Sequence, residues 1–193
     1  MRHNQHPTFG FTTRANGIAR ELINEIYISE LHDEGSPESI KRPYKAIWDT
    51  GATNSVITRK VAQELNLTPS GRAPCQVVGA ADQLTTHDTD TFLVDIYLPN
   101  NVHITGVRVS EMSVGGGDVL LGMDIIALGD FAVTSHNGQT WWTFRAPSNE
   151  PIDFVKEIND HNQRHQPQGG TPRLREWLEK NSKKQGMRKK KRK

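Results

Sequence analysis

The chain has 193 residues, of which 34% are hydrophobic, and its formal net charge is +2. That length supports one hydrophobic core of ordinary size rather than two. No stretch approaches the ~18 consecutive apolar residues of a membrane-spanning helix, and the single cysteine, Cys75, excludes an internal disulfide framework. Because the N-terminus also lacks the apolar segment of a secretory signal, we expect a cytoplasmic protein.

The first part of the chain predicts an arm followed by two strands. Residues 1–20 are polar and rich in Thr, Asn and Gly, which favours a flexible arm. Residues 22–29 have strand composition, and a segment rich in turn formers leads to a second predicted strand over 44–48. This strand runs directly into Asp49, a residue type that strands usually exclude.

The middle of the chain predicts a β domain with little helix. A short amphipathic helix is expected over 58–67, with Thr58 as its N-cap. A buried strand that runs into a short helix is expected over 119–129, and Asn137-Gly138 predicts a hairpin within 131–144. Further segments have strand composition: 75–79, 91–98 and 102–109.

Beyond Pro147 the pattern changes to two short predicted helices, over 151–163 and 172–181, separated by a linker. Residues 183–193 predict a disordered basic tail. Two interpretations of this tail remain open: a solvated, solubilising segment, or nonspecific binding to nucleic acid or another anionic surface. The basic residues concerned are Lys189, Lys190, Lys191, Arg192 and Lys193.

The most informative motif is Asp49-Thr50-Gly51 in its context. An Asp-Thr-Gly tripeptide alone is weak evidence, but here an apolar strand precedes it, and Ala52 and Ser55 follow at the spacing Asp-Thr-Gly-Ala-x-x-Ser. Leu120-Leu121-Gly122 comes later, its glycine 73 residues after the acid. On these motifs, residues 21–145 resemble the retropepsin-like aspartic proteases.

The resemblance implies a mainly β fold, a closed barrel-like domain over 21–146 with one or two short helices. A helical or linker extension (147–182) and the basic tail (183–193) would follow. Asp49 would be catalytic, and the hairpin over 75–89 would form a flap above an extended peptide substrate. Support of the active-site loop is implied for Thr50, Gly51, Ala52, Ser55, Leu121 and Gly122, and flap or substrate contacts for Val77, Val78, Gly79, Ala80 and Ala81.

The chemistry of the family explains why one acid per chain suffices. Two carboxylates about 3 Å apart cannot both be ionised, so the pair holds one proton and activates a water molecule without a metal or other cofactor. Since the chain has one Asp-Thr-Gly, the resemblance implies a homodimer that joins two copies of Asp49. The predicted function is therefore an aspartic endopeptidase. The alternative is a noncatalytic dimerisation or peptide-binding module of this fold with a nucleic-acid-binding tail.

Other candidate residues have competing interpretations. Asp124 suits capping of the helix that follows better than catalysis. His161 and His165 have the i, i+4 spacing of metal ligands, but no third ligand is evident, so we predict no metal site. Trp141 and Trp142 point to opposite faces of a strand, so one is expected in the core. The other would lie either against a partner subunit or at a solvent edge.

Overall fold

The computed structural model describes residues 7–31, 40–78 and 84–164. The chain divides into two compact units, 1–151 and 152–193. The elements of the first unit are β1 (Phe9–Arg14), β2 (Leu22–Glu30), β3 (Arg42–Trp48), β4 (Val56–Ile57), α1 (Arg59–Glu64), β5 (Gly71–Val78), β6 (Leu84–Leu98), β7 (Val102–Glu111), β8 (Val119–Leu121), α2 (Met123–Ile126), β9 (Asp130–His136) and β10 (Gln139–Ala146). The described helix of the second unit is α3 (Phe154–Arg164).

A closed barrel forms the body of the first unit. The strands follow the order β2-β3-β8-β4-β7-β6, and β2 also pairs with β6, which closes the ring. β5 pairs with β6 outside this ring. The predicted mainly β, closed fold with short helices is therefore confirmed.

The core follows the two-residue period of the strands. Ile26 and Ile28 of β2 and Val94 and Ile96 of β6 are fully buried, as expected for alternate residues on the inner face of a barrel. Helix α1 contributes Val61 and its neighbour to the same core. Its N-cap residue is Thr58, as predicted, although the Thr58 side chain makes no capping hydrogen bond.

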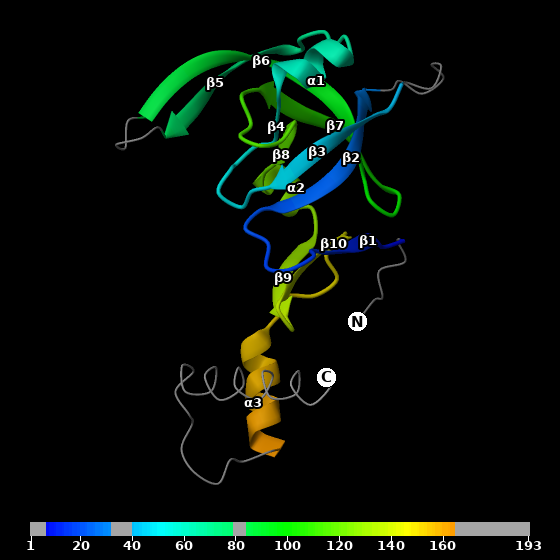
Figure 1. Cartoon of the computed structure of the whole chain (residues 1–193), viewed down its shortest axis with the longest axis vertical. Helices are drawn as coiled ribbons and strands as arrows, with labels where there is room; N and C mark the ends of the chain where they lie inside the picture. Colours follow the sequence, from blue (N-terminus) through cyan, green and yellow to red (C-terminus); the bar gives the residue numbers. More distant parts are fainter. Residues whose placement is uncertain (1–6, 32–39, 79–83, 165–193) are drawn as a thin grey trace, which may run out of the picture. The chain divides into compact units, whose positions relative to one another are not determined.

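The long strand β6 extends beyond the barrel. Its second half pairs with β7 and β2, whereas its first half pairs with β5 as a hairpin that projects from the barrel (Figure 1). Val77 and Val78 lie at the end of β5. Gly79, Ala80 and Ala81, predicted at the tip of the flap, lie outside the described residues.

A separate three-stranded sheet has the order β1-β10-β9. β1 pairs with β10 from Phe9↔Ala146 to Arg14↔Trp141. The predicted flexible arm over 1–20 is therefore wrong for residues 9–14. The two Phe and two Thr of Phe9–Arg14 suit a strand. Phe11 is buried beside Trp48 and Phe144, with ring centroids 6.0 and 6.2 Å away, and these contacts stabilise the strand.

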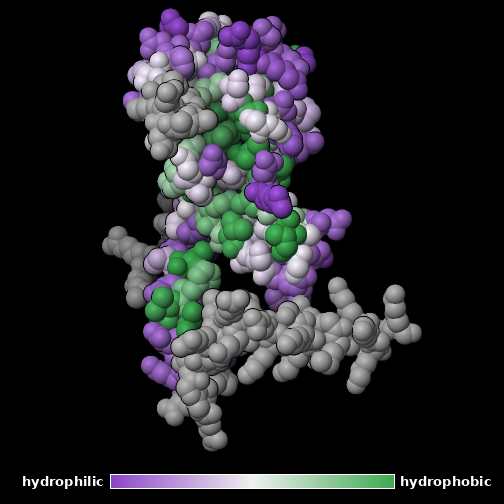
Figure 2. Space-filling view, turned by 60° about the vertical axis from the view of Figure 1, so that its left-hand side comes forward, coloured by the Kyte–Doolittle hydropathy of each residue, from purple (hydrophilic) through white to green (hydrophobic). Residues whose placement is uncertain are grey.

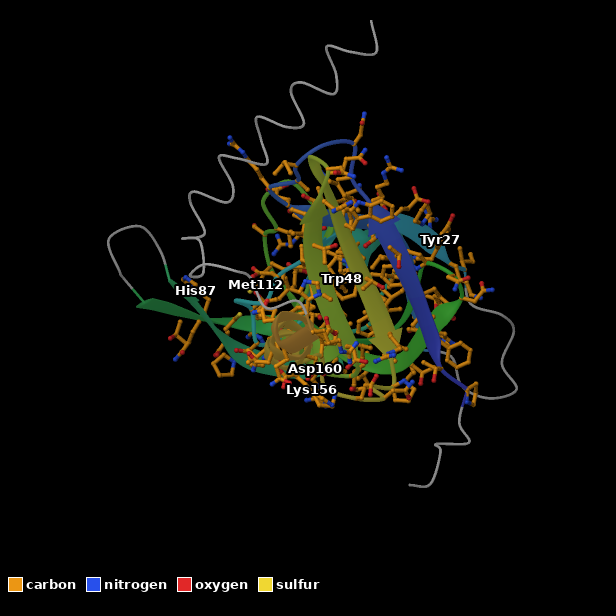
Figure 3. All side chains as sticks on the ribbon, turned by 90° about the horizontal axis from the view of Figure 1, so that it is seen from below. Tyr27, Trp48, His87, Met112, Lys156 and Asp160 are labelled. Atoms are coloured by element: carbon orange, nitrogen blue, oxygen red, sulfur yellow. The ribbon has the colours of Figure 1, made fainter. Side chains whose placement is uncertain are left out.

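One buried amide joins the barrel to this sheet. The indole N–H groups of Trp48 and Trp142 both donate to Asn24 Oδ1, at 2.9 and 2.8 Å. Asn24 Nδ2 donates in turn to Thr13 Oγ1 at 2.7 Å. Trp48, labelled in Figure 3, also stacks on Phe131 of β9 at 4.9 Å. The hydrogen bond to Asn24 and the ring contact with Phe131 therefore fix the position of Trp48, the last residue of β3.

The two adjacent tryptophans divide as predicted between two faces. Trp142 is buried in the core, and Trp141 lies on the opposite face with the Arg14 guanidinium 5.0 Å from its ring centroid.

In the second unit, the predicted helix over 151–163 corresponds to α3, all of whose residues are exposed. The predicted helix over 172–181, the basic tail and His165 lie outside the described residues. No helix in the described part of the chain is long and apolar enough to cross a membrane.

Candidate active site

Two parallel strands position Asp49. β3 pairs with β8 in the register Trp48↔Leu121, and the Asp49 N–H donates to the Leu121 carbonyl at 2.9 Å. Asp49 therefore follows directly on the end of β3, with its backbone bound to β8. The residue is half-buried, although the strand that delivers it belongs to the core.

The Asp49 carboxylate is only partly used within its own chain. Oδ1 accepts the Gly51 N–H at 2.8 Å, whereas no hydrogen bond to Oδ2 is found among the described residues. A Cβ added at Gly51 would lie 3.1 Å from Oδ1, so a side chain there would crowd the carboxylate. Thr50 and Gly51 are exposed. One oxygen of the acid is thus available to a water molecule or to a second acid.

The segment that begins at Leu121-Gly122 braces the Asp49 loop through backbone hydrogen bonds. Beyond the Asp49 contact, the Met123 N–H donates to the Ala52 carbonyl at 2.8 Å, and the Asp124 N–H donates to the Thr53 carbonyl at 3.1 Å. These bonds hold the chain on the far side of Gly51 as well, so the loop is bound to this segment at both ends.

Ser55 and Asp124 add a second layer of support. The buried Ser55 hydroxyl donates to Asp124 Oδ1 at 2.7 Å and accepts the Gly122 N–H at 3.0 Å. The Ser55 N–H donates to Asp124 Oδ2 at 2.9 Å. The predicted capping role of Asp124 is only partly correct, because Gly122 occupies the N-cap. Asp124 lies in the first turn, accepts the Ile125 N–H at 3.0 Å, and mainly fixes Ser55.

Replacing Gly122 tests this brace. A Cβ there would lie 2.7 Å from the Asn54 carbonyl carbon and oxygen and 3.0 Å from the Ala52 carbonyl oxygen, all backbone atoms that cannot rotate away. We expect Gly122→Ala to lower the free energy of unfolding by about 1–3 kcal/mol, as overpacking does. The matched control is Gly115→Ala, where nothing lies within 4 Å and the backbone is not left-handed. Equal denaturant midpoints for the two variants would contradict the brace.

Asp118 binds three elements around the start of β8. It accepts the Lys45 N–H at 3.1 Å and the Lys60 ammonium at 3.0 Å, and its carbonyl accepts the Thr58 N–H at 3.0 Å. Burial alone would raise the pKa of Asp118, but the Lys45 N–H and the Lys60 ammonium outweigh burial and hold that pKa below its usual value. Asp118 thereby ties β3, α1 and β8 together.

This lowered pKa predicts a pH-dependent contribution to stability. A carboxyl whose pKa is lower in the folded state stabilises the fold above its unfolded pKa of about 4, and this contribution is lost as pH falls through the folded value. Asp118→Asn should therefore lower the Tm at pH 7 by a few degrees, on the order of 2–4 °C. The difference from the unaltered protein should shrink as pH falls from about 4 toward 2. A constant difference in Tm over that range would contradict the assignment.

The structure brings most of the predicted site residues together. Asp49, Ala52, Ser55, Leu121 and Gly122 form one bonded cluster, and Thr50 and Gly51 complete its exposed edge. Of the predicted flap residues, the structure describes the backbone of Val77 and Val78 only. Within the described ranges there is no group of three or more His, Cys, Asp or Glu side chains that would hold a metal ion.

Comparisons with known proteins give one family match. Residues 40–127 match the family model described as "gag-polyprotein putative aspartyl protease". This range contains both Asp49 and the Leu121-Gly122 segment. No curated protein matches the chain.

The chain also matches solved structures. A retropepsin-like aspartic protease from Rickettsia conorii is 13% identical, with a TM-score of 0.44 and coverage of 72% of this chain and 96% of that chain. The EIAV protease complexed with the inhibitor HBY-793 is 18% identical, with a TM-score of 0.41 and coverage of 58% of this chain and 91% of that chain.

Proposed function

Since the chain belongs to the retropepsin-like aspartyl protease family, we propose that it is an aspartic endopeptidase whose active site is completed by a second copy of itself. The observation that carries this proposal is the state of Asp49. A firmly bound backbone presents a carboxylate with one oxygen unused by the described residues, on a loop whose edge is exposed. Such an acid is suited to meet a symmetry-related acid.

In the proposed reaction, the two copies of Asp49 hold one proton between them. The ionised carboxylate takes a proton from a water molecule as the water oxygen forms a bond to the carbonyl carbon of the peptide. The other carboxyl gives its proton to the carbonyl oxygen, which receives the electron pair of the former double bond. The dyad then gives its proton to the amide nitrogen, and the C–N bond breaks with its electron pair leaving on nitrogen. A hydroxyl of the tetrahedral intermediate re-forms the carbonyl and returns its proton to the dyad, which again holds one proton. No covalent intermediate with the enzyme forms.

Strand β9 offers a route to the dimer. It is an edge strand of the three-stranded sheet, and its sequence, Asp130–His136, contains neither proline nor lysine, the residues that commonly block pairing at an edge. Its central residue, Val133, is 48% exposed. Antiparallel pairing of two β9 strands about a two-fold axis near Val133 would join the two sheets and cover this side chain.

The projecting hairpin suits a substrate in the extended conformation. A peptide that lies beneath β5 and β6 would pair as an added strand and place alternate side chains in pockets. Figure 2 brings the side of the hairpin forward, and in the upper part of that view apolar residues gather between polar margins. This distribution supports binding of a peptide on that face.

The test is digestion of a mixed peptide library across a range of pH, with and without a statine-type transition-state mimic, beside sedimentation of the same samples. We expect cleavage that the mimic inhibits and that rises with the fraction of dimer. A stable dimer that binds peptides but cleaves none would instead support the noncatalytic module, and a monomer with full activity would contradict the shared dyad.

A further inference from the structure

A groove of about 800 Å³ lies at the base of the projecting hairpin. Three parts of the chain line it: the start of α1, the strands β5 and β6, and the segment that follows β7. Figure 3 shows His87 of β6 and Met112 of the last segment near one another in this region. We call this feature the hairpin groove.

The hairpin groove is connected to the candidate active site through β4. β4 follows the Asp49 loop and pairs with β7, where the Ser110 N–H donates to the Ser55 carbonyl at 3.3 Å and the Met112 N–H donates to the Ile57 carbonyl at 2.9 Å. The groove therefore begins where this strand ends, and the hairpin forms its other wall. An extended peptide bound beneath the hairpin would pass along it.

Part of the lining of the hairpin groove is apolar and adaptable. The Cys75 thiol contacts the Met112 thioether, and Val114 also belongs to the lining. Sulfur-containing side chains adjust readily to the shape of a ligand. Thr58 also belongs to the lining, and its hydroxyl is buried without a hydrogen-bond partner among the described residues. This surface suits the aliphatic part of a side chain with a polar end.

Two ion pairs lie on the α1 side of the hairpin groove, Arg59–Glu111 and Lys60–Asp118. Arg59 Nε bonds Glu111 Oε1 at 2.8 Å, and the side chains are 76% and 18% exposed respectively. Lys60 bonds Asp118 at 3.0 Å, and those side chains are 59% and 23% exposed. In both pairs the cation is the exposed member. Because Arg59 uses Nε for Glu111, its terminal N–H groups can bind a further carboxylate.

We propose that the hairpin groove is a side-chain subsite of the protease that prefers a glutamate or aspartate of the substrate, bound by Arg59. This proposal rests on the proposed function. The carboxylate of the substrate would meet the fixed guanidinium, and its methylene groups would cover the Cys75 and Met112 sulfur atoms. The exposed Asp88 on the opposite wall would repel the same carboxylate. The preference for an acidic residue therefore depends on Arg59 on the α1 side.

The test exchanges the charges of Arg59 and Glu111, the ion pair on the α1 side of the hairpin groove. The double variant Arg59→Glu/Glu111→Arg keeps an ion pair but places the acid on the exposed side. A mixed peptide library is digested by each protein, and the residues around the cleaved bonds are counted by mass spectrometry. The unaltered protein should favour acidic over basic residues at one position by about fivefold, which is typical of one well-placed exposed ion pair. The double variant should reverse this preference.

The control is Lys156→Glu, an exposed charge reversal in the second unit, which should leave the preference unchanged. The same preference in the double variant, with unchanged thermal unfolding, would overturn the subsite while the proposed function stands. If the unaltered protein cleaves no peptide, the proposed function fails. The subsite is then decided by fluorescence anisotropy with labelled peptides that differ in one Glu or Lys: tighter binding of the Glu peptide, reversed by the exchange, supports it, and equal binding overturns it.

Discussion

Replacing Asp49 with asparagine is expected to abolish peptide cleavage without unfolding the protein. Asparagine has the same shape and keeps an oxygen that accepts the Gly51 N–H, so the loop bonds described above persist. Its amide neither takes a proton from water nor donates one as an acid. Since a positioned acid or base contributes about 10²- to 10⁴-fold, and a dimer of this variant lacks both acids, kcat/KM should fall by at least about 10³-fold.

The measurement compares kcat/KM and Tm for Asp49→Asn with those for Asp124→Asn. Asp124 lies near the same loop, but its carboxylate bonds Ser55 and Ile125. We expect Asp124→Asn to lower the Tm and to retain most of the cleavage by the protein that remains folded. If Asp49→Asn cleaves peptides as fast as the unaltered protein, Asp49 is not the catalytic acid.

Replacing Asn24 with leucine is expected to cause a large loss of stability. Trp48 and Trp142 are 6% and 4% exposed, so neither indole N–H would find water to replace Asn24 Oδ1. A buried donor left without an acceptor costs about 1–3 kcal/mol. Two such donors predict a loss of about 2–6 kcal/mol in the free energy of unfolding, a large fraction of the total for a domain of this size.

The control for this variant is Thr13→Val, which removes only the acceptor of the Asn24 amide N–H. It should cost about 1–3 kcal/mol at most, because both indole bonds remain. Chemical denaturation gives both values. A free energy of unfolding for Asn24→Leu equal to that for Thr13→Val would show that the two tryptophans do not depend on Asn24. Because Trp48 precedes Asp49, we also expect Asn24→Leu to reduce cleavage more than Thr13→Val does.

The parts of the fold that sequence predicted are those with local signals. The strand composition of residues 22–29, the Asn137-Gly138 turn and the apolar strand before Asp49 each indicate their structure within a few residues. The motif pair around Asp49 and Gly122 also predicted the loop and its brace, although 73 residues separate them, because their residue types and spacing resemble those of a family.

The features that sequence analysis missed depend on partners far along the chain. β1 contains two Phe and two Thr, which are common in strands, but nothing in its sequence indicates that its partner is β10, some 130 residues later. Asn24 lies on the inward phase of β2, in line with Ile26 and Ile28, and an inward polar residue is a signal that a buried partner is required. The sequence therefore indicates that Asn24 needs a buried partner, but it does not identify Trp48 and Trp142 as the two donors. The bond between Asp124 and Ser55 likewise depends on Gly122 being the N-cap of α2, which places Asp124 in the first turn.

The most direct test of the shared dyad is the activity of mixed dimers. Unaltered protein is mixed with a threefold excess of Asp49→Asn at constant total concentration and allowed to exchange subunits. If each active site needs Asp49 from both chains, activity depends on the square of the unaltered fraction, and about one sixteenth of the activity of the undiluted protein should remain. A remaining activity of about one quarter, in proportion to the unaltered fraction, would show that each chain acts alone and would contradict the account.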